Sequence, residues 1–307
     1  MAINPAIRLA IKAISYSDVD MKKFYKVQRT LQTIKSPKIN NRFYKMWDNK
    51  IVSGGREILT RIYEPKEKTR TQLLLFFHGG GWVTESVDTY NRVCVNLANH
   101  TGCRVMSVEY RLAPENPFPD GLDDCYAVAH NILSQPQLLG IETSDVVLIG
   151  DSAGGNFAAV ISMVIRDIGE YNIKKQILIY PATYNIHDDT SPFDSVKKFG
   201  TDYLLTSRHI CEYMDMYVTD KACLNTPYIA PLLAESFTGL PDTLVITAEF
   251  DPLRDEGEMY AQKINQAGGS AHVHRVHDAI HGFFALDARY AHVKEAYRVI
   301  NAFLNKE

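Results

Sequence analysis

The sequence predicts an α/β fold in which a mostly parallel sheet is covered by helices on both faces. From about residue 56 to the C-terminus, short apolar runs alternate with segments of helical periodicity, which is typical of parallel sheets. One run, Leu73–Phe77, is continuously apolar, as expected for a strand that is buried on both faces. A chain of 307 residues that is 46% hydrophobic can bury one large core with a smaller appendage.

The predicted elements follow one another along the chain. Alternating or continuous apolar character predicts strands at residues 57–63, 73–77, 104–110, 146–149, 177–180, 243–247 and 271–276. Apolar residues at helical spacing predict helices at residues 89–99, 122–133, 156–165, 256–266 and 293–304. Gly102 and the pair Gly268-Gly269 supply stop signals after two of these helices.

Two amphipathic helices are predicted within residues 1–35. Their apolar faces are formed by Ile7, Ala10, Ile11 and Ile14 in the first helix and by Phe24, Val27, Leu31 and Ile34 in the second. We expect both faces to pack on another part of the protein, because such faces are not stable in water. Pro37 ends the helical run.

The regular alternation lapses between about residues 182 and 240. This segment is rich in aromatic and other large side chains, namely Tyr184, Phe199, Tyr203, Tyr213, Met214, Tyr217 and Tyr228. An insertion of this kind predicts a lid, and plain core packing of the same rings is the alternative.

The charge distribution argues against nucleic acid as a partner. The formal net charge is −3, but residues 1–50 carry eleven Lys and Arg against three Asp, a local net charge of +8. The remainder therefore carries −11, because −3 minus +8 is −11. We interpret the basic stretch as a solvated surface or as a face that docks on the acidic body, with a contact to anionic lipid as the alternative.

Cysteine usage and hydropathy predict a cytoplasmic protein. The five cysteines are odd in number, widely spaced and without a CxxC pair, which argues against a disulfide framework or a zinc site. The first residues lack a signal-peptide pattern, because Arg8 and Lys12 interrupt the apolar run. No stretch has the length needed to cross a bilayer, so we expect no stable membrane insertion.

The run Gly-Asp-Ser-Ala-Gly-Gly at residues 150–155 predicts a nucleophile. It lies between a predicted strand and a predicted helix, as the motif G-x-S-x-G requires. Gly150 and Gly154 allow a tight turn that exposes Ser152, and an ordinary glycine turn is the alternative. The similar motif of chymotrypsin-like proteases is excluded, because those proteins are all-β and place their His and Asp before the serine.

Three further motifs supply what a serine nucleophile needs. His78-Gly79-Gly80-Gly81-Trp82 follows a buried strand, so the N–H groups of Gly80, Gly81 and Ala153 are predicted to form an oxyanion hole, while His78 holds the loop. Asp251 and His281 each follow a predicted strand. The order Ser152, Asp251, His281 is the one expected for an α/β-hydrolase.

A metal site is a weaker interpretation of the histidine-rich segment near the C-terminus. His272, His274, His277 and His281 form the pattern H-x-H-x-x-H-x-x-x-H. No HExxH motif or cysteine partner accompanies them, so we predict no metal and interpret the pattern as an exposed polar strand face.

Together these motifs resemble the hormone-sensitive-lipase-like family of α/β-hydrolase carboxylesterases. The resemblance runs from about residue 70 to the C-terminus and includes the sequences YRLAPE at 110–115 and YIAPL at 228–232. It implies an α/β-hydrolase core at residues 46–181 and 241–307, with a small helical cap made of residues 1–45 and the insertion 182–240. At Asp278 the sequence departs from relatives, which usually have glycine there.

The resemblance implies a serine carboxylesterase that hydrolyses short-chain acyl esters through an acyl-enzyme. The catalytic triad is predicted to be Ser152, Asp251 and His281, with no cofactor, and Trp82, Tyr184 and Tyr203 are candidates for substrate binding. An amidase or acyltransferase with the same triad is an alternative. A non-catalytic ligand receptor, like the plant gibberellin receptors that resemble this family, is an alternative of a different class. The resemblance also implies a homodimer.

Overall fold

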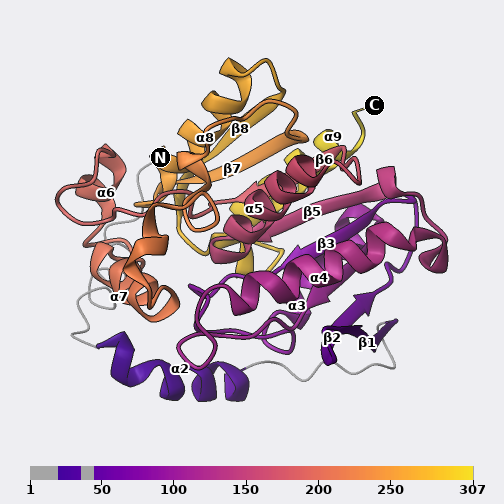
Figure 1. Ribbon diagram of the computed structural model, residues 1–307, viewed down its shortest axis with the longest axis horizontal. Helices are drawn as coiled ribbons and strands as arrows, with labels where there is room; N and C mark the ends of the chain where they lie inside the picture. Colours follow the sequence, from indigo (N-terminus) through magenta and orange to yellow (C-terminus); the bar gives the residue numbers. More distant parts are fainter. Residues whose placement is uncertain (1–19, 36–44, 307) are drawn as a thin grey trace.

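The computed structural model describes residues 20–35 and 45–306, which form an eight-stranded sheet with helices on both faces (Figure 1). The strand order is β1-β2-β4-β3-β5-β6-β7-β8. Strands β3 to β8 run parallel to one another, and β2 is antiparallel to both β1 and β4. The predicted fold class is therefore confirmed.

The strands are short at the centre and longer at the edges. Their bounds are β1 Met46–Ser53, β2 Arg56–Tyr63, β3 Leu73–Phe77, β4 Arg104–Val108, β5 Val146–Asp151, β6 Lys175–Ile179, β7 Asp242–Phe250 and β8 Ala271–Ile280. All residues of β3 and β5 are buried, which explains the continuously apolar runs Leu73–Phe77 and Val146–Ile149.

The helices are distributed over the two faces of the sheet. Their bounds are α2 Met21–Lys35, α3 Asn91–Thr101, α4 Asp120–Ser134, α5 Ala153–Ile168, α6 Asp194–Phe199, α7 Ser207–Tyr217, α8 Arg254–Gln266 and α9 Ala291–Leu304. Short 3-10 helices lie at Pro136–Leu139, Thr143–Asp145, Lys221–Asn225, Pro231–Leu233 and Phe283–Ala285. None of these described helices is long and apolar enough to cross a membrane.

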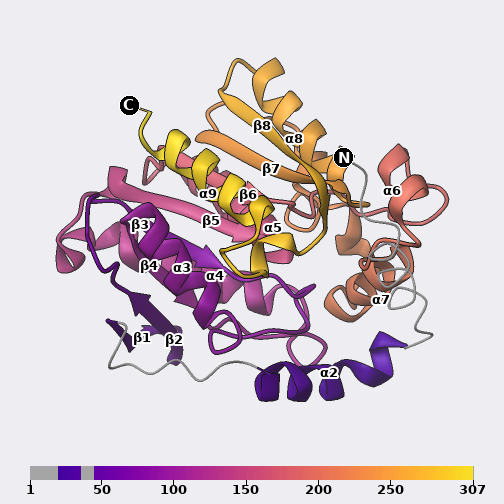
Figure 2. The same cartoon turned by 180° about the vertical axis from the view of Figure 1, so that it is seen from behind.

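Two hydrophobic clusters hold the layers together. The apolar side chains of α4, α5 and α8 pack on one face of the sheet, against Leu73, Leu75 and Phe77 of β3. Those of α3 and α9 pack on the other face, against Leu74 and Phe76 of the same strand. Figure 1 shows α5 in front of the sheet and Figure 2 shows α9 in front of it. Alternate residues of one strand thus serve two cores.

Most predicted elements are present, with shifted ends. The strand at 73–77 has the predicted bounds, whereas β4 ends two residues early and β8 continues to Ile280. Helix α5 begins at Ala153 and not at residue 156, because it starts directly at the turn that follows β5. Strand β1 was not predicted, since four consecutive residues of this edge strand are exposed and it carries no apolar pattern.

Helix α2 packs on the protein through a different face from the predicted one. Met21 and Tyr25 are buried, whereas Val27, Leu31 and Ile34 are exposed. The expectation that these three residues pack against another element is therefore wrong for the described residues. The first predicted helix, at Ile7 to Ile14, lies outside the described residues.

Helices α2, α6 and α7 gather beside the ends of the central strands (Figure 1). Helix α2 contacts α7, where the N–H of Met21 donates to Glu212 at 3.0 Å and Lys22 pairs with Asp215 at 2.9 Å. Both α6 and α7 come from the predicted insertion 182–240. The division of the chain into core and cap at the stated boundaries stays a proposal.

Candidate active site

Ser152 lies at a sharp turn between β5 and α5. Its backbone has φ 54° and ψ −119°, a conformation that a residue with a side chain rarely adopts. A Cβ atom on Gly150 would lie 2.2 Å from the carbonyl oxygen of Gly154, and one on Gly154 would lie 2.0 Å from that of Phe77. Side chains at these glycines would push α5 away from the sheet. The glycines of the motif therefore hold Ser152 at the end of the strand.

The imidazole of His281, which follows β8, joins the hydroxyl of Ser152 to the carboxylate of Asp251. Nε2 of His281 lies 2.9 Å from Oγ of Ser152, and Nδ1 lies 2.7 Å from Oδ2 of Asp251. With its proton on Nδ1, the ring donates to the carboxylate and leaves Nε2 to accept from the hydroxyl. The side chains of His281 and Asp251 are 11% and 0% exposed, which excludes water from their contact.

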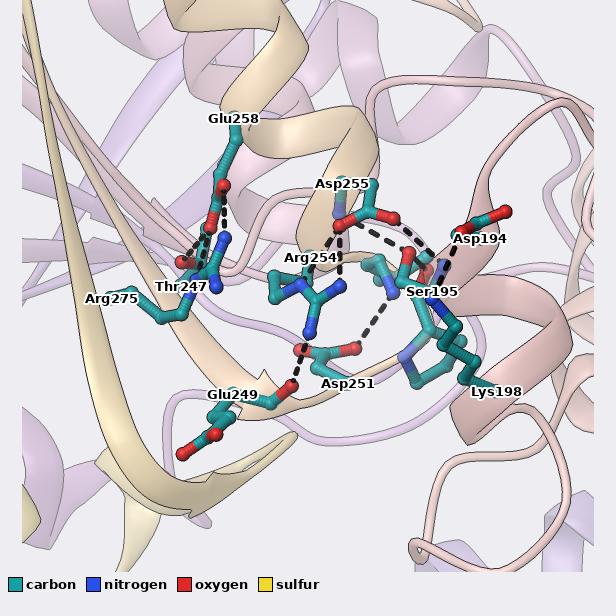
Figure 3. A network of polar contacts seen from close by, with 12 residues as sticks. Asp194, Ser195, Lys198, Thr247, Glu249, Asp251, Arg254, Asp255, Glu258 and Arg275 are labelled. Carbon is teal, nitrogen blue, oxygen red and sulfur yellow. Dashed lines mark hydrogen bonds and ion pairs between the residues drawn. The ribbon is translucent and has the colours of Figure 1, made fainter.

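Polar contacts fix the loop that carries Asp251 (Figure 3). Oδ1 of Asp251 accepts from the N–H of Leu253 at 2.9 Å, which turns Oδ2 toward the imidazole. Next along the chain, Arg254 donates to Asp255 at 2.8 Å, and Asp255 accepts from the N–H of Ser195 in α6 at 2.8 Å. The carboxylate is therefore held by the first turn of α8, which is itself tied to α6.

Asp278, where the family resemblance predicts glycine, adopts the backbone conformation that favours glycine. Its φ is 59°, and its N–H donates to the carboxylate of Glu249 at 2.8 Å. Aspartate tolerates this region better than most residues. The chain therefore keeps the bend before His281 without the glycine.

Gly80, Gly81 and Ala153 line the same cavity as Ser152. Gly80 has φ 107° and Gly81 has φ 62°, and a Cβ on Gly80 would lie 2.3 Å from the carbonyl oxygen of Thr84. In the part of the chain that the structure describes, no backbone hydrogen bond uses the N–H of Gly80, Gly81 or Ala153. Three donors beside the hydroxyl are the arrangement that an oxyanion requires.

Two buried titratable side chains support the loop that carries Gly80 and Gly81. Nδ1 of His78 lies 2.8 Å from the carbonyl oxygen of Gly79, and its ring stacks on Tyr110 with centroids 4.2 Å apart. Oδ1 of Asp151 accepts from the N–H of Gly79 at 2.8 Å. Burial lowers the pKa of His78 to about 4 and raises the pKa of Asp151 to about 6. The loop is therefore supported by a neutral imidazole and by a carboxyl group whose acidity is weakened by burial.

A cavity of about 420 Å³ opens beside Ser152. One wall contains the residues described above, Gly80, Gly81, Ser152, Ala153 and His281. The opposite wall comes from α2, α7 and the segment before α7, with Met21, Phe24, Gln28, Gln32, Leu204, Leu205, His209, Ile210 and Tyr213. A cavity of this size suits a small ligand.

Of the three aromatic residues predicted to bind substrate, only Trp82 lines this cavity. The ring of Tyr184 packs edge-on against Phe193, with centroids 5.2 Å apart, and that of Tyr203 stacks on Phe250 at 5.2 Å. Both rings pack on other aromatic side chains and lie outside the lining of this cavity. Their part in substrate binding stays a prediction.

The sequence analysis named Phe24 and Tyr213 but missed the other cavity residues of α2 and α7. Met21, Gln28 and Gln32 recur at helical spacing, but the apolar residues of α2 favoured a different face. Tyr213 was noted only as one of several aromatic residues. Its ring lies so close to Gly81 that a Cβ there would be 2.7 Å from it.

The histidine-rich segment of β8 does not converge on one point. Nε2 of His274 lies 2.8 Å from Oε1 of Glu295, and Nε2 of His272 lies 3.0 Å from Nζ of Lys306. Among residues 20–35 and 45–306, no group of three or more His, Cys, Asp or Glu side chains is arranged to hold a metal ion.

Comparisons with known proteins match the chain to α/β-hydrolase esterases. A family model described as alpha/beta hydrolase fold matches residues 74–285. The carboxylic ester hydrolase LipN of Mycobacterium tuberculosis is 38% identical over 247 residues, which are 78% of this chain and 64% of LipN. An arylesterase of Saccharolobus solfataricus is 35% identical over 77% of this chain and 76% of its own length.

Solved structures extend the similarity over nearly the whole chain. The esterase of Pyrobaculum calidifontis superposes with a TM-score of 0.85 and 35% sequence identity, covering 98% of this chain and 97% of the esterase. An α/β-hydrolase esterase is indicated by the family match, by the fold and by the arrangement of Ser152, His281 and Asp251. The chain belongs to the hormone-sensitive-lipase-like family of α/β-hydrolase esterases.

Proposed function

We propose that this carboxylic ester hydrolase cleaves short-chain acyl esters in two steps through an acyl-enzyme on Ser152. The observation that carries the proposal is the line of contacts from Oγ of Ser152 through His281 to Asp251, at 2.9 and 2.7 Å. In the first step Oγ attacks the ester carbonyl while Nε2 of His281 takes its proton. The same Nε2 then returns the proton to the leaving alcohol.

Water completes the cycle by the same route. It attacks the acyl group on Ser152 as Nε2 of His281 takes a proton, and collapse of the intermediate restores the serine hydroxyl. Asp251 accepts a hydrogen bond from Nδ1 throughout and stabilises the cationic ring. In both steps the negative oxygen lies among the N–H groups of Gly80, Gly81 and Ala153, each of which contributes about 3 kcal/mol to transition-state stabilisation.

The preference for short acyl chains rests on the size of the cavity. The cavity of about 420 Å³ between α2, α7 and the strand ends accommodates a small ester. The receptor alternative has little support, because the imidazole of His281 lies within hydrogen-bond distance of Ser152. The homodimer stays a prediction.

Replacing Ser152 by alanine tests the proposal. We expect turnover of p-nitrophenyl acetate to fall by at least about 10⁴-fold, because no other hydroxyl occupies this position. Circular dichroism and the thermal unfolding midpoint should stay close to wild type, since the substitution removes one oxygen atom. A purified Ser152→Ala protein with wild-type turnover would falsify the mechanism. Rates over a series of acyl lengths, from acetate to dodecanoate, test the chain-length preference.

A further inference from the structure

Glu85, in the loop that follows β3, has a strained backbone. Its φ is 71°, in the left-handed region that favours glycine. A charged side chain in that conformation is uncommon, and such strain persists where the surrounding structure holds it. Residues of this kind are concentrated at ligand sites. Binding of a ligand by the Glu85 side chain would account for this strained backbone.

The side chain of Glu85 lies in the wall of the cavity, beside the oxyanion loop. Its Cγ is so near Gly80 that a Cβ on that glycine would lie 2.9 Å away. Burial raises the pKa of Glu85 above its ordinary value. A carboxyl group is thus held in a partly dehydrated cavity within reach of a bound ester.

Glu85 keeps acceptor capacity for a ligand. Gln32 of α2 donates to Oε1 of Glu85 and the side chain of Thr89 is a second hydrogen-bond partner, whereas no ion pair within the described residues includes Glu85. A carboxylate has room for about four hydrogen bonds. His209 also lines the cavity, but it is a poor partner for an ion pair with Glu85. Burial lowers the pKa of His209, which favours the neutral ring.

The second acidic side chain of the cavity wall is already satisfied. Asp151 accepts from the N–H of Gly79 at 2.8 Å and from the hydroxyls of Tyr90 at 2.9 Å and Tyr180 at 3.3 Å. Among the described residues of this wall, Glu85 is therefore the acidic group that retains acceptor capacity for a donor from outside the protein.

We propose that Glu85 determines specificity by accepting a hydrogen bond from a hydroxyl or ammonium group of the substrate. This inference rests on the proposed ester hydrolysis. The preferred esters then carry such a donor on the part of the molecule that lies beside the oxyanion loop. Esters that lack a donor leave the carboxylate desolvated and without a partner, which weakens their binding.

Matched pairs of esters test the proposal. At the alcohol end, 2-hydroxyethyl butyrate is compared with propyl butyrate, and 2-ammonioethyl butyrate with the same propyl ester. At the acyl end, ethyl 3-hydroxybutyrate is compared with ethyl 3-methylbutyrate. The readout is the ratio of kcat/KM for the donor-bearing ester to that for its apolar partner. We expect a ratio of about ten or more for at least one pair in the wild type.

Two variants separate charge from acceptor capacity. Glu85→Gln keeps an acceptor oxygen without the charge, so it should lose the ammonium preference and retain part of the hydroxyl preference. Glu85→Met keeps the chain length without any acceptor, so both ratios should fall to about one. Glu85→Gly, which adopts a positive φ freely, serves if either variant fails to fold, and it should also lose both preferences.

The matched control is Glu67→Gln, which removes the same charge from an exposed position before β3, at the far end of that strand. It should keep the wild-type ratios. The inference is overturned if the wild type shows no preference at either end, or if Glu85→Met and Glu85→Gly keep it. Failure of the wild type to hydrolyse any of the esters would instead contradict the proposed function.

Discussion

The two walls of the cavity are built by different kinds of contact. The wall that carries Ser152, His281 and Asp251 stands on the ends of buried parallel strands, and its side chains are positioned by backbone turns. The opposite wall, from α2 and α7, is attached by side-chain contacts, several of them exposed. In the pair Lys22–Asp215, for example, the side chains are 49% and 44% exposed.

This difference separates the reaction from its selectivity. Strand ends buried in a sheet cannot shift without opening the core, so the reacting groups keep their distances. Exposed ion pairs contribute little to stability, so the polar contacts between α2 and α7 can change at low energetic cost, whereas Ile210, Met214 and Tyr217 of α7 are buried in the main hydrophobic cluster. We expect substitutions in the first wall to affect catalysis or folding, and substitutions in the second to affect mainly substrate binding.

The largest effect is expected at the first wall, from Asp251→Asn. Asparagine presents an N–H to the ring of His281 and favours the wrong tautomer, so kcat should fall by about 10⁴-fold with little loss of stability. Steady-state kinetics with p-nitrophenyl acetate measures this. The control is Asp242→Asn, the same substitution at the opposite end of β7, which should keep near wild-type activity. Equal losses in the two variants would contradict the assigned role.

Gly154→Ala should destabilise the contact between α5 and β3, which supports the wall that carries Ser152. The added carbon would lie 2.0 Å from the carbonyl oxygen of Phe77, so α5 must move, at a cost of about 3 kcal/mol or more in the free energy of unfolding. Gly140→Ala is the control, because nothing lies within 4 Å of its added carbon. Its cost should be about 1 kcal/mol, from the positive φ alone. Urea denaturation compares the two, and similar values would show that the turn is not tightly packed.

The buried pair His78 and Asp151 predicts a pH effect on stability. The folded pKa of Asp151, about 6, lies above its ordinary 3.8, so its contribution falls as the pH rises from about 4 to 6. The folded pKa of His78, about 4, lies below its ordinary 6.5, so its contribution rises over nearly the same range. In the wild type the two contributions oppose each other.

Asp151→Asn should therefore expose the effect of His78. On acidification from pH 6.5 to 4, the variant should lose about 3 kcal/mol more of its free energy of unfolding than the wild type loses. Urea denaturation at several pH values measures the difference. If stability depended on pH in the same way in the two proteins, the pKa of Asp151 in the folded protein would not be raised.

The smallest effects are expected at the α2 wall. Arg29 donates to the carbonyl oxygens of Val83 and Ala113, at 2.6 and 2.7 Å, and pairs with Glu115 at 3.0 Å. Arg29→Met should raise KM several-fold, with kcat little changed, and cost about 1 kcal/mol of stability. Lys22→Met, which removes only an exposed ion pair, should cost less than about 0.5 kcal/mol. If the two variants behaved alike, α2 would not be anchored through Arg29.

The same division explains what could be predicted from the sequence. The motif at 150–155 is local, because strand, turn and helix are contiguous, and Leu73–Phe77 is unambiguous because both of its faces are buried. Asp251 and His281 could be paired because each follows a parallel strand. The positions of α2 and α7 in the opposite wall depend on contacts between residues far apart in the chain. Hydrophobic periodicity does not encode such contacts.

The wrong predictions concern that second wall and the sheet edge. Val27, Leu31 and Ile34 have the spacing of a buried face, yet α2 turns Met21 and Tyr25 inward because Arg29 and the N–H of Met21 find partners on that side. Strand β1 was missed because a half-exposed edge strand needs no apolar pattern.

The close approach of Gly154 to Phe77 has a consequence for directed evolution. Strand β3 and helix α5 meet with no space for one added methyl group, so a mutant library that randomises residues 77–81 and 150–155 will consist largely of clones that do not fold. A library confined to the cavity positions of α2 and α7 does not alter the contact between β3 and α5. New ester selectivities should be sought there, where each clone still carries a complete reaction centre.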